Sequence, residues 1–244
     1  MTSDGILLVT GASSDVGAKL IRETYGNYKK IWAHYHSSAE VVEELRKELG
    51  DVICPIQADF SSEDSVQNMI EVIKASGDLP DHVLHLSAPK ARNVKFQKTN
   101  WEEFQRELDT SLRSIVMILQ AFLPAMAKAG HGKVVLMLTA YTLGMPPKFQ
   151  SVYVTAKYAL LGLMKSLAAE YAAKGITVNA VSPEMMETKF LSDLPELIVA
   201  QNAAASPLGR NLTVEDVVPA IAYLLSEASN AVTGQNLGIT GGAR

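Results

Sequence analysis

Thr10-Gly11-Ala12-Ser13-Ser14-Asp15-Val16-Gly17 lies between an apolar run, Ile6–Thr10, and a segment with helical periodicity, Ala18–Tyr25. A strand, a glycine-containing turn and a helix in this order present unpaired N–H groups and a positive dipole end to a phosphate. Glycine there permits the tight turn and a close approach of the backbone. Two glycines alone are a weak signal, and a plain strand–helix turn is the alternative. Their position favours a pyrophosphate site.

Strand-like and helix-like segments alternate along the rest of the chain. The expected strands are Ile6–Thr10, Lys30–Tyr35, Val52–Ala58, His82–Ser87, Lys133–Thr139, Thr177–Ser182 and Asn236–Ile239. The expected helices are Ala18–Tyr25, Ala39–Leu49, Ser62–Ala75 with Ser61 or Ser62 as cap, one long stretch from Asn100 to about Lys128, Ser151–Lys174, and Thr213–Ser226 with Thr213 as cap. This order predicts an α/β fold: one Rossmann-type doubly wound parallel sheet of about seven strands with helices on both faces. We expect a single domain over residues 1–244.

One long segment, Glu184–Arg210, shows no regular pattern. It follows an expected strand end, where ligands bind in doubly wound sheets. We interpret it as a substrate lid, with an ordinary surface loop as the alternative. The apolar segments Met145–Pro147 and Met185–Leu191 would line an acyl or aromatic channel, or would belong to the core.

Composition excludes several classes of function. The formal net charge of −4 disfavours nucleic acid as a partner. No apolar run reaches about 18 residues, so no membrane partner is expected, and no secretory signal pattern opens the chain. The single cysteine, Cys54, lies in an apolar run and is interpreted as a buried strand thiol. We expect a cytoplasmic protein without a metal site.

Tyr153-Val154-Thr155-Ala156-Lys157 places a phenol and an ammonium at positions i and i+4 of a helix, on one face. Reducing a ketone requires an acid that protonates the developing alkoxide. A nearby ammonium favours a phenolate and lowers the pKa of a tyrosine. Tyr153 is therefore a candidate acid, with Lys157 as its modulator, although the pair alone is a weak signal.

The end of the second strand, His34-Tyr35-His36-Ser37-Ser38, bears on the nucleotide. A carboxylate at this position usually bonds the ribose hydroxyls of NAD. None is present, so a 2′-phosphate would meet no repulsion, and His36 with the serine hydroxyls would bond it. The alternative for His36 is an ordinary surface histidine.

These motifs together resemble the short-chain dehydrogenase/reductase family. The glycine turn is similar to its Thr-Gly-x-x-x-Gly-x-Gly pattern, with Asp15 in place of the middle glycine. Tyr153–Lys157, followed by Gly175-Ile176-Thr177-Val178-Asn179-Ala180-Val181-Ser182-Pro183, resembles its catalytic helix and the next strand. Thr233-Gly234-Gln235 and Gly241-Gly242 match its C-terminal pattern, so the resemblance covers essentially the whole chain.

The resemblance implies roles for individual residues. Tyr153 would be the acid, Lys157 would also bond the nicotinamide ribose, and Thr139 would hold the substrate oxygen. Ser111 takes the place of an asparagine that relays protons through water, or is only a helix-facing polar residue. Asp59 would accept from the adenine amino group and Phe60 would flank the ring. The implied cofactor-binding set is Gly11, Ser13, Ser14, Asp15, Val16, Gly17, His36, Ser37, Asp59, Phe60, Ser87, Ala88, Tyr153, Lys157, Pro183, Met186 and Thr188.

Four positions depart from the family pattern: Asp15, Ser111, Pro89 and Glu184. Asp15 would cap the first helix, repel a pyrophosphate, or turn outward. A carboxylate in a partly buried phosphate site costs on the order of 1–3 kcal/mol. Glu184 adds a second carboxylate near the expected edge of the cofactor.

Within the family the chain most resembles the 3-oxoacyl-[acyl-carrier-protein] reductase branch. That implies an NADP(H)-dependent ketoreductase, with NAD(H) less favoured, acting on a 3-oxoacyl thioester of acyl carrier protein or CoA. The alternative is a weakly active or non-catalytic member that is a partner subunit of a related reductase. An NAD-linked alcohol dehydrogenase is a third interpretation. The family implies a homo-tetramer, or a hetero-oligomer with a related subunit, formed through the segments Asn100–Lys128 and Ser151–Lys174.

Overall fold

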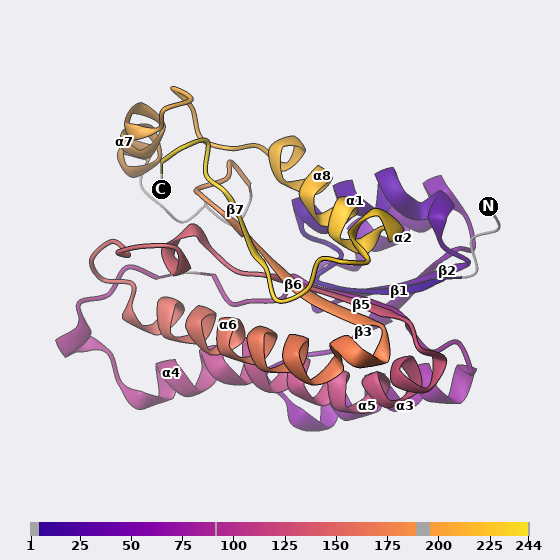
Figure 1. The fold of residues 1–244 in the computed structure, drawn as a ribbon. Coiled ribbons are helices and arrows are strands. Elements are labelled where there is room, and N and C mark those ends of the chain that lie inside the picture. The colour runs from indigo at the N-terminus through magenta and orange to yellow at the C-terminus, as the bar shows by residue number, and fades with distance from the viewer. Residues whose placement is uncertain (1–4, 91, 189–195, 244) are drawn as a thin grey trace.

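A parallel sheet forms the centre of the molecule (Figure 1). The structure, a computed structural model, describes residues 5–90, 92–188 and 196–243. In that part of the chain seven strands pair in the order β3-β2-β1-β4-β5-β6-β7. They are β1 (Ile6–Thr10), β2 (Lys30–Tyr35), β3 (Ile53–Gln57), β4 (His82–His85), β5 (Gly132–Met137), β6 (Ile176–Pro183) and β7 (Asn236–Ile239). The doubly wound sheet predicted from the alternation is confirmed.

Helices cover both faces of this sheet (Figure 1). On one face lie α1 (Asp15–Thr24), α2 (Ala39–Leu49) and α8 (Val214–Leu225); on the other lie α3 (Glu63–Ser76), α4 (Trp101–Leu108), α5 (Ser114–Ala129) and α6 (Ser151–Tyr171). Successive side chains of a strand point to opposite faces. Leu7 and Val9 therefore pack into the first layer, and Leu8 packs into the second with Phe122.

Side-chain caps fix the starts of two helices where the sequence predicted them. The Ser62 hydroxyl accepts a hydrogen bond from Ser65 N at 3.3 Å. Thr213 and Asp216 form a capping box at the start of α8. These contacts satisfy backbone N–H groups that have no partner within the helix.

The long helix expected from Asn100 to about Lys128 is interrupted. A π-helical turn, Asp109–Arg113, separates α4 from α5. Such turns are rare and occur as single turns inside an α-helix, and the sequence predicted one continuous helix here. Trp101–Ala129 has the length and hydropathy of a membrane span. We interpret it as a core helix because Ile115, Ile118 and Phe122 are fully buried within the second layer.

The segment Glu184–Arg210 is not wholly irregular. It contains α7 (Glu196–Ala205), which the sequence analysis missed. The helix has no one-sided apolar stripe and no buried residue, so the usual signal of an amphipathic helix is lacking. Asn211 connects it to the preceding chain, because its amide donates to Val199 O and to Glu187 Oε1. Residues 189–195, including part of the expected lid, lie outside the described residues.

Candidate active site

The predicted site residues lie beyond the carboxyl ends of neighbouring strands. Gly11 follows β1 directly. Two strands end two residues earlier than predicted, β4 at His85 and β5 at Met137, so Ser87 and Thr139 lie beyond them. β1 pairs with β4, although β2 and β3 come between them in sequence. The order of the strands reverses at this point, where doubly wound sheets have a ligand crevice.

The glycine turn has the conformation that its sequence predicts. Gly11 has a φ of 70°, in the left-handed region. A Cβ on Gly17 would lie 2.8 Å from both Ala12 Cα and Gly11 O, so only glycine fits there. Ser14 caps α1, because its hydroxyl accepts from Gly17 N at 3.1 Å. The N-cap residue is thus Ser14, and Asp15 is the first residue of α1.

A neutral histidine fixes this turn to the next two strands. His34 Nδ1 accepts from Gly11 N at 3.0 Å, and His34 Nε2 donates to Ala58 O at 3.0 Å. Burial lowers the pKa of His34 to about 4, so the ring stays neutral at physiological pH. The sequence indicated no role for His34, because its partners Gly11 and Ala58 come from two distant segments.

The expected adenine end differs in one respect from the prediction. Phe60 is 3% exposed, and its ring stacks on His34 with the centroids 4.0 Å apart. Its face is thus covered by protein and is not available to an adenine ring. The Asp59 carboxylate is exposed and accepts from Ser61, and its Oδ2 lies 3.9 Å from His36 Nε2.

The predicted acid and lysine lie together. Lys157 Nζ is 5.5 Å from the centre of the Tyr153 ring and donates to Met137 O at 2.9 Å. The Thr139 side chain interacts with the Tyr153 hydroxyl and acts to lower its pKa. This places the three predicted side chains in one group, beyond the end of β5 and at the start of α6.

The electrostatics of this group contradict one expectation. Burial raises the pKa of Tyr153 above its ordinary value, and Lys157 does not reverse the shift. The pKa of Lys157 itself is lowered to about 8, because burial disfavours its ammonium form. Desolvation penalises both charged forms, so in this structure the phenol stays protonated.

A buried carboxyl next to this group was missed. Glu107 is 6% exposed, and burial raises its pKa to about 7, against the opposing effects of Lys157 and Ser111. Ser111 Oγ donates to Glu107 Oε1 at 3.4 Å. The spacing i and i+4 on one helix could have linked these two residues. In the sequence, however, an acidic residue of an amphipathic helix usually indicates a solvent-exposed face.

The π-helical turn places Ser111 against β4. His85 Nε2 donates to Ser111 O at 2.9 Å, and His85 Nδ1 accepts from the Thr10 hydroxyl at 2.8 Å. Burial lowers the pKa of His85 to about 3, so this ring is neutral too. The chain of contacts joins β1, β4 and the turn that carries Ser111.

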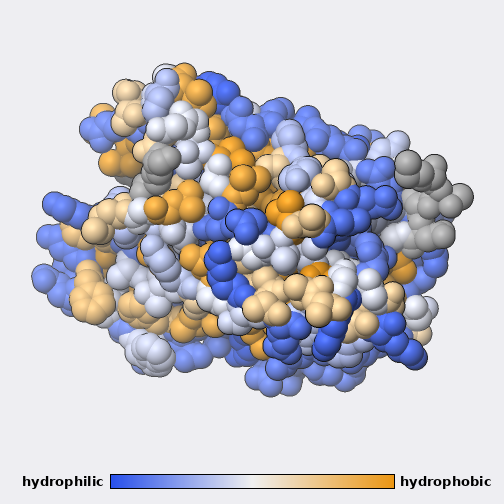
Figure 2. All heavy atoms as spheres, in the orientation of Figure 1, coloured by the Kyte–Doolittle hydropathy of each residue, from blue (hydrophilic) through white to orange (hydrophobic). Residues whose placement is uncertain are grey.

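A pocket of about 250 Å³ opens beside Tyr153 and Glu107. Its wall includes Arg92, Arg106 and Phe149. Phe149 has a φ of 71°, a conformation that side chains disfavour and that clusters at functional sites. Met145 is 87% exposed. The alternative that the segment Met145–Pro147 belongs to the hydrophobic core is therefore wrong. Figure 2 shows apolar residues on the surface around the notch between α7 and the layer of α4 and α6.

The remaining predicted cofactor residues surround the same strand ends. Ser87 and Ala88 follow β4, and Pro183 ends β6. Met186 pairs with Leu212 in an isolated bridge, and Thr188 is half-buried nearby in sequence. Glu184 N donates to Ile239 O at 2.9 Å, which ties the start of this segment to β7.

Comparison with known proteins identifies the family. A family model described as enoyl-(acyl carrier protein) reductase matches residues 11–244. The curated 3-oxoacyl-[acyl-carrier-protein] reductase of Staphylococcus aureus is 31% identical over 241 residues, which cover 96% of each chain. The chain belongs to the short-chain dehydrogenase/reductase family.

Other relatives of the family agree with this assignment. The 3-oxoacyl-[acyl-carrier-protein] reductase of Chlamydia muridarum is 29% identical over 96% of this chain and 95% of its own. The crystal structure of the 3-oxoacyl-[acyl-carrier protein] reductase of Brucella melitensis has a TM-score of 0.88 at 25% identity, covering 99% of this chain and 91% of that one. A solved short chain dehydrogenase/reductase family protein has a TM-score of 0.86 at 27% identity, covering 99% and 98%. The chain is thus related to oxidoreductases, which implies a nicotinamide cofactor.

Proposed function

We propose that this family member is an NADP(H)-dependent ketoreductase that reduces a 3-oxoacyl thioester, carried by acyl carrier protein or CoA, to the hydroxy product. The observation that carries the proposal is the group of Tyr153, Lys157 and Thr139 beside a pocket at the strand ends. The names of the curated relatives support the substrate class. The description of the matching family model makes an enoyl thioester the competing substrate.

The residues of the crevice fit a dinucleotide. The lack of a Cβ at Gly17 lets the first turn of α1 pack directly against the backbone of Gly11 and Ala12. This would hold the N-terminus of α1 against a pyrophosphate, with Ser13, Ser14 and Val16 around it. Asp59 remains the proposed acceptor for the adenine amino group. Phe60 is no longer proposed to flank the adenine ring, because its face is covered by His34. Ser87, Ala88, Pro183, Met186 and Thr188 would hold the nicotinamide half together with Lys157.

Proton transfer falls to the chain's own side chains. Bound dinucleotide would supply the hydride for the carbonyl carbon. Thr139 would donate a hydrogen bond to the carbonyl oxygen, and Tyr153 would protonate it as the alkoxide develops. Because burial favours the neutral phenol, Tyr153 begins in the form that donates. Lys157 would stabilise the phenolate that remains.

Glu107 would return a proton toward Lys157 and Tyr153. It lines the pocket with Tyr153, interacts electrostatically with Lys157, and bonds Ser111 at 3.4 Å. A carboxyl with a pKa of about 7 exchanges protons readily at neutral pH. Ser111 would thus contribute to the relay through Glu107.

A partner subunit with weak or absent catalysis is the second candidate function. Asp15 in the first turn of α1 favours it, since a carboxylate there would weaken pyrophosphate binding by on the order of 1–3 kcal/mol. Either function is compatible with assembly as a homo-tetramer or with a related subunit through α4, α5 and α6.

Comparing the affinities for NADPH and NADH tests the cofactor. The two ligands differ by one phosphate, so fluorescence titration of the untagged protein with each isolates its contribution. We expect tighter binding of NADPH, and we expect His36→Ala to weaken NADPH binding while leaving NADH binding unchanged. Equal affinities in the wild type would overturn NADP(H) specificity, and an equal loss for both ligands would remove His36 from the phosphate site.

A further inference from the structure

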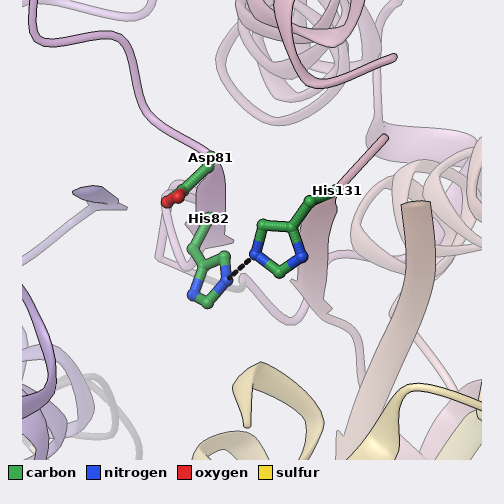
Figure 3. A group of neighbouring side chains, drawn as sticks. All are labelled: Asp81, His82 and His131. Carbon is green, nitrogen blue, oxygen red and sulfur yellow. Dashed lines mark hydrogen bonds between the residues drawn. The ribbon is translucent and has the colours of Figure 1, made fainter. Parts of the chain in front are cut away.

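A cluster of metal-ligating side chains lies at the edge of the sheet opposite the candidate active site. Asp81 immediately precedes β4, His82 begins that strand, and His131 immediately precedes β5. Figure 3 shows the rings of His82 and His131 facing one another beside Asp81. The sequence predicted no metal site, because two separate segments supply these residues.

The distance between the two histidines matches that of a metal site, and the Asp81 carboxylate lies close enough to complete it. His82 Nε2 and His131 Nε2 are 3.2 Å apart, and one ligand atom from each of the three residues lies within 4.8 Å of the others. Two Zn–N bonds of about 2.0–2.1 Å at a tetrahedral angle separate the nitrogens by about 3.3 Å. Two imidazoles and one carboxylate leave a fourth position for water, as in open zinc sites.

Neighbouring groups hold two of these side chains in place. His82 Nδ1 hydrogen-bonds the Tyr28 hydroxyl at 3.0 Å, which leaves Nε2 as the ligand atom. Such a contact to the second ring nitrogen is usual for a metal-bound histidine. Asp81 Oδ1 accepts from Ile6 N at 2.8 Å, which orients the carboxylate.

The charges nearby permit a cation. Two imidazoles supply neutral nitrogen ligands, and the Asp81 side chain supplies a carboxylate. Lys133 acts on His82 electrostatically and opposes a bound cation. Its ammonium, however, is held by the side chains of Ser229 and Asn230.

We propose that Asp81, His82 and His131 bind one divalent transition-metal ion of the Zn²⁺ class and thereby join the starts of β4 and β5. This site is independent of the proposed reductase function, because it lies at the opposite ends of the strands. Bound metal would raise the melting temperature, since it binds the folded chain.

Zn²⁺ titration against a chromophoric chelator tests the proposal on untagged, full-length protein. All variants are made in a background protein that carries Cys54→Ser and His36→Ala. These two changes remove the free thiol and the exposed imidazole beside Asp59, which would otherwise compete for Zn²⁺. We expect one equivalent of Zn²⁺ to bind and to raise the melting temperature, and Co²⁺ to give the intense visible bands of a tetrahedral site. His131 is exposed, so His131→Ala should fold normally and lose at least 100-fold in affinity. Tyr28→Phe should lose about 10- to 100-fold, through the ligand it orients.

The results that overturn the site are specific. No binding in the background protein, or one-equivalent binding that survives His131→Ala, would show that the two rings form only a histidine–histidine hydrogen bond. Circular dichroism of each variant would confirm that its fold is retained, so that a lost signal reports the ligand and not unfolding.

Discussion

Replacing Tyr153 by phenylalanine should reduce the turnover of a 3-oxoacyl thioester by about 10²–10⁴-fold. The substitution removes the hydroxyl that interacts with Thr139 and leaves the ring that lies beside Lys157. NADPH binding, measured by fluorescence titration, should therefore stay within a factor of about two to three, while kcat falls. Turnover equal to the wild type would eliminate Tyr153 as the acid.

Glu107→Gln tests the proposed role of Glu107 beside Tyr153 and Lys157. The substitution keeps the size of the side chain and removes its charge. Glu107 raises the pKa of Lys157, which burial lowers to about 8. Without the carboxylate the pKa of Lys157 should fall further, so the alkaline limb of the pH–rate profile should move to lower pH. A lower rate with an unmoved profile would mean that Glu107 only shapes the pocket.

Gly17→Ala should have the largest effect on the cofactor site. The added methyl would lie 2.8–2.9 Å from the backbone of Gly11 and Ala12, which has no flexible side chain to displace. Forcing an extra methyl into packed structure costs typically 1–3 kcal/mol. We expect a decrease of that size in the free energy of unfolding, measured by urea titration, and a loss of NADPH binding.

Gly26→Ala is the control for this substitution. A Cβ at Gly26 meets nothing within 4 Å, and Gly26 is not among the glycines with positive φ. Its unfolding free energy should stay within about 0.5 kcal/mol of the wild type. Gly17→Ala protein with wild-type stability and NADPH affinity would show that the turn opens to admit a side chain, contrary to its geometry here.

The sequence predicted the features that depend on local pattern. Alternating segments indicated the parallel sheet, the Thr10–Gly17 turn lies where it was placed, and the i, i+4 spacing brought Tyr153 and Lys157 together. Ser62 and Thr213 begin their helices because capping depends on residues within one turn. These signals are local in the chain, so no tertiary information is needed to find them.

What the sequence missed depends on contacts between distant segments. The burial of Phe60 against His34 follows from the packing of β2 beside the chain after β3. Glu107 is buried because α4 and α6 pack together around Lys157. The same burial raises the pKa of Tyr153, whereas the isolated Tyr–Lys pair predicted a decrease. Desolvation is a property of the folded environment and has no signature in a single helix.

The most direct test of the account is the oxidation of NADPH by this protein with a 3-oxoacyl thioester, followed in parallel with the matching 2-enoyl thioester. We predict saturable consumption of NADPH with the 3-oxoacyl substrate, formation of the hydroxyacyl product, and little consumption with the enoyl substrate. Turnover of the enoyl thioester alone would contradict the ketoreductase assignment. NADPH binding without turnover of either substrate would favour the non-catalytic partner subunit.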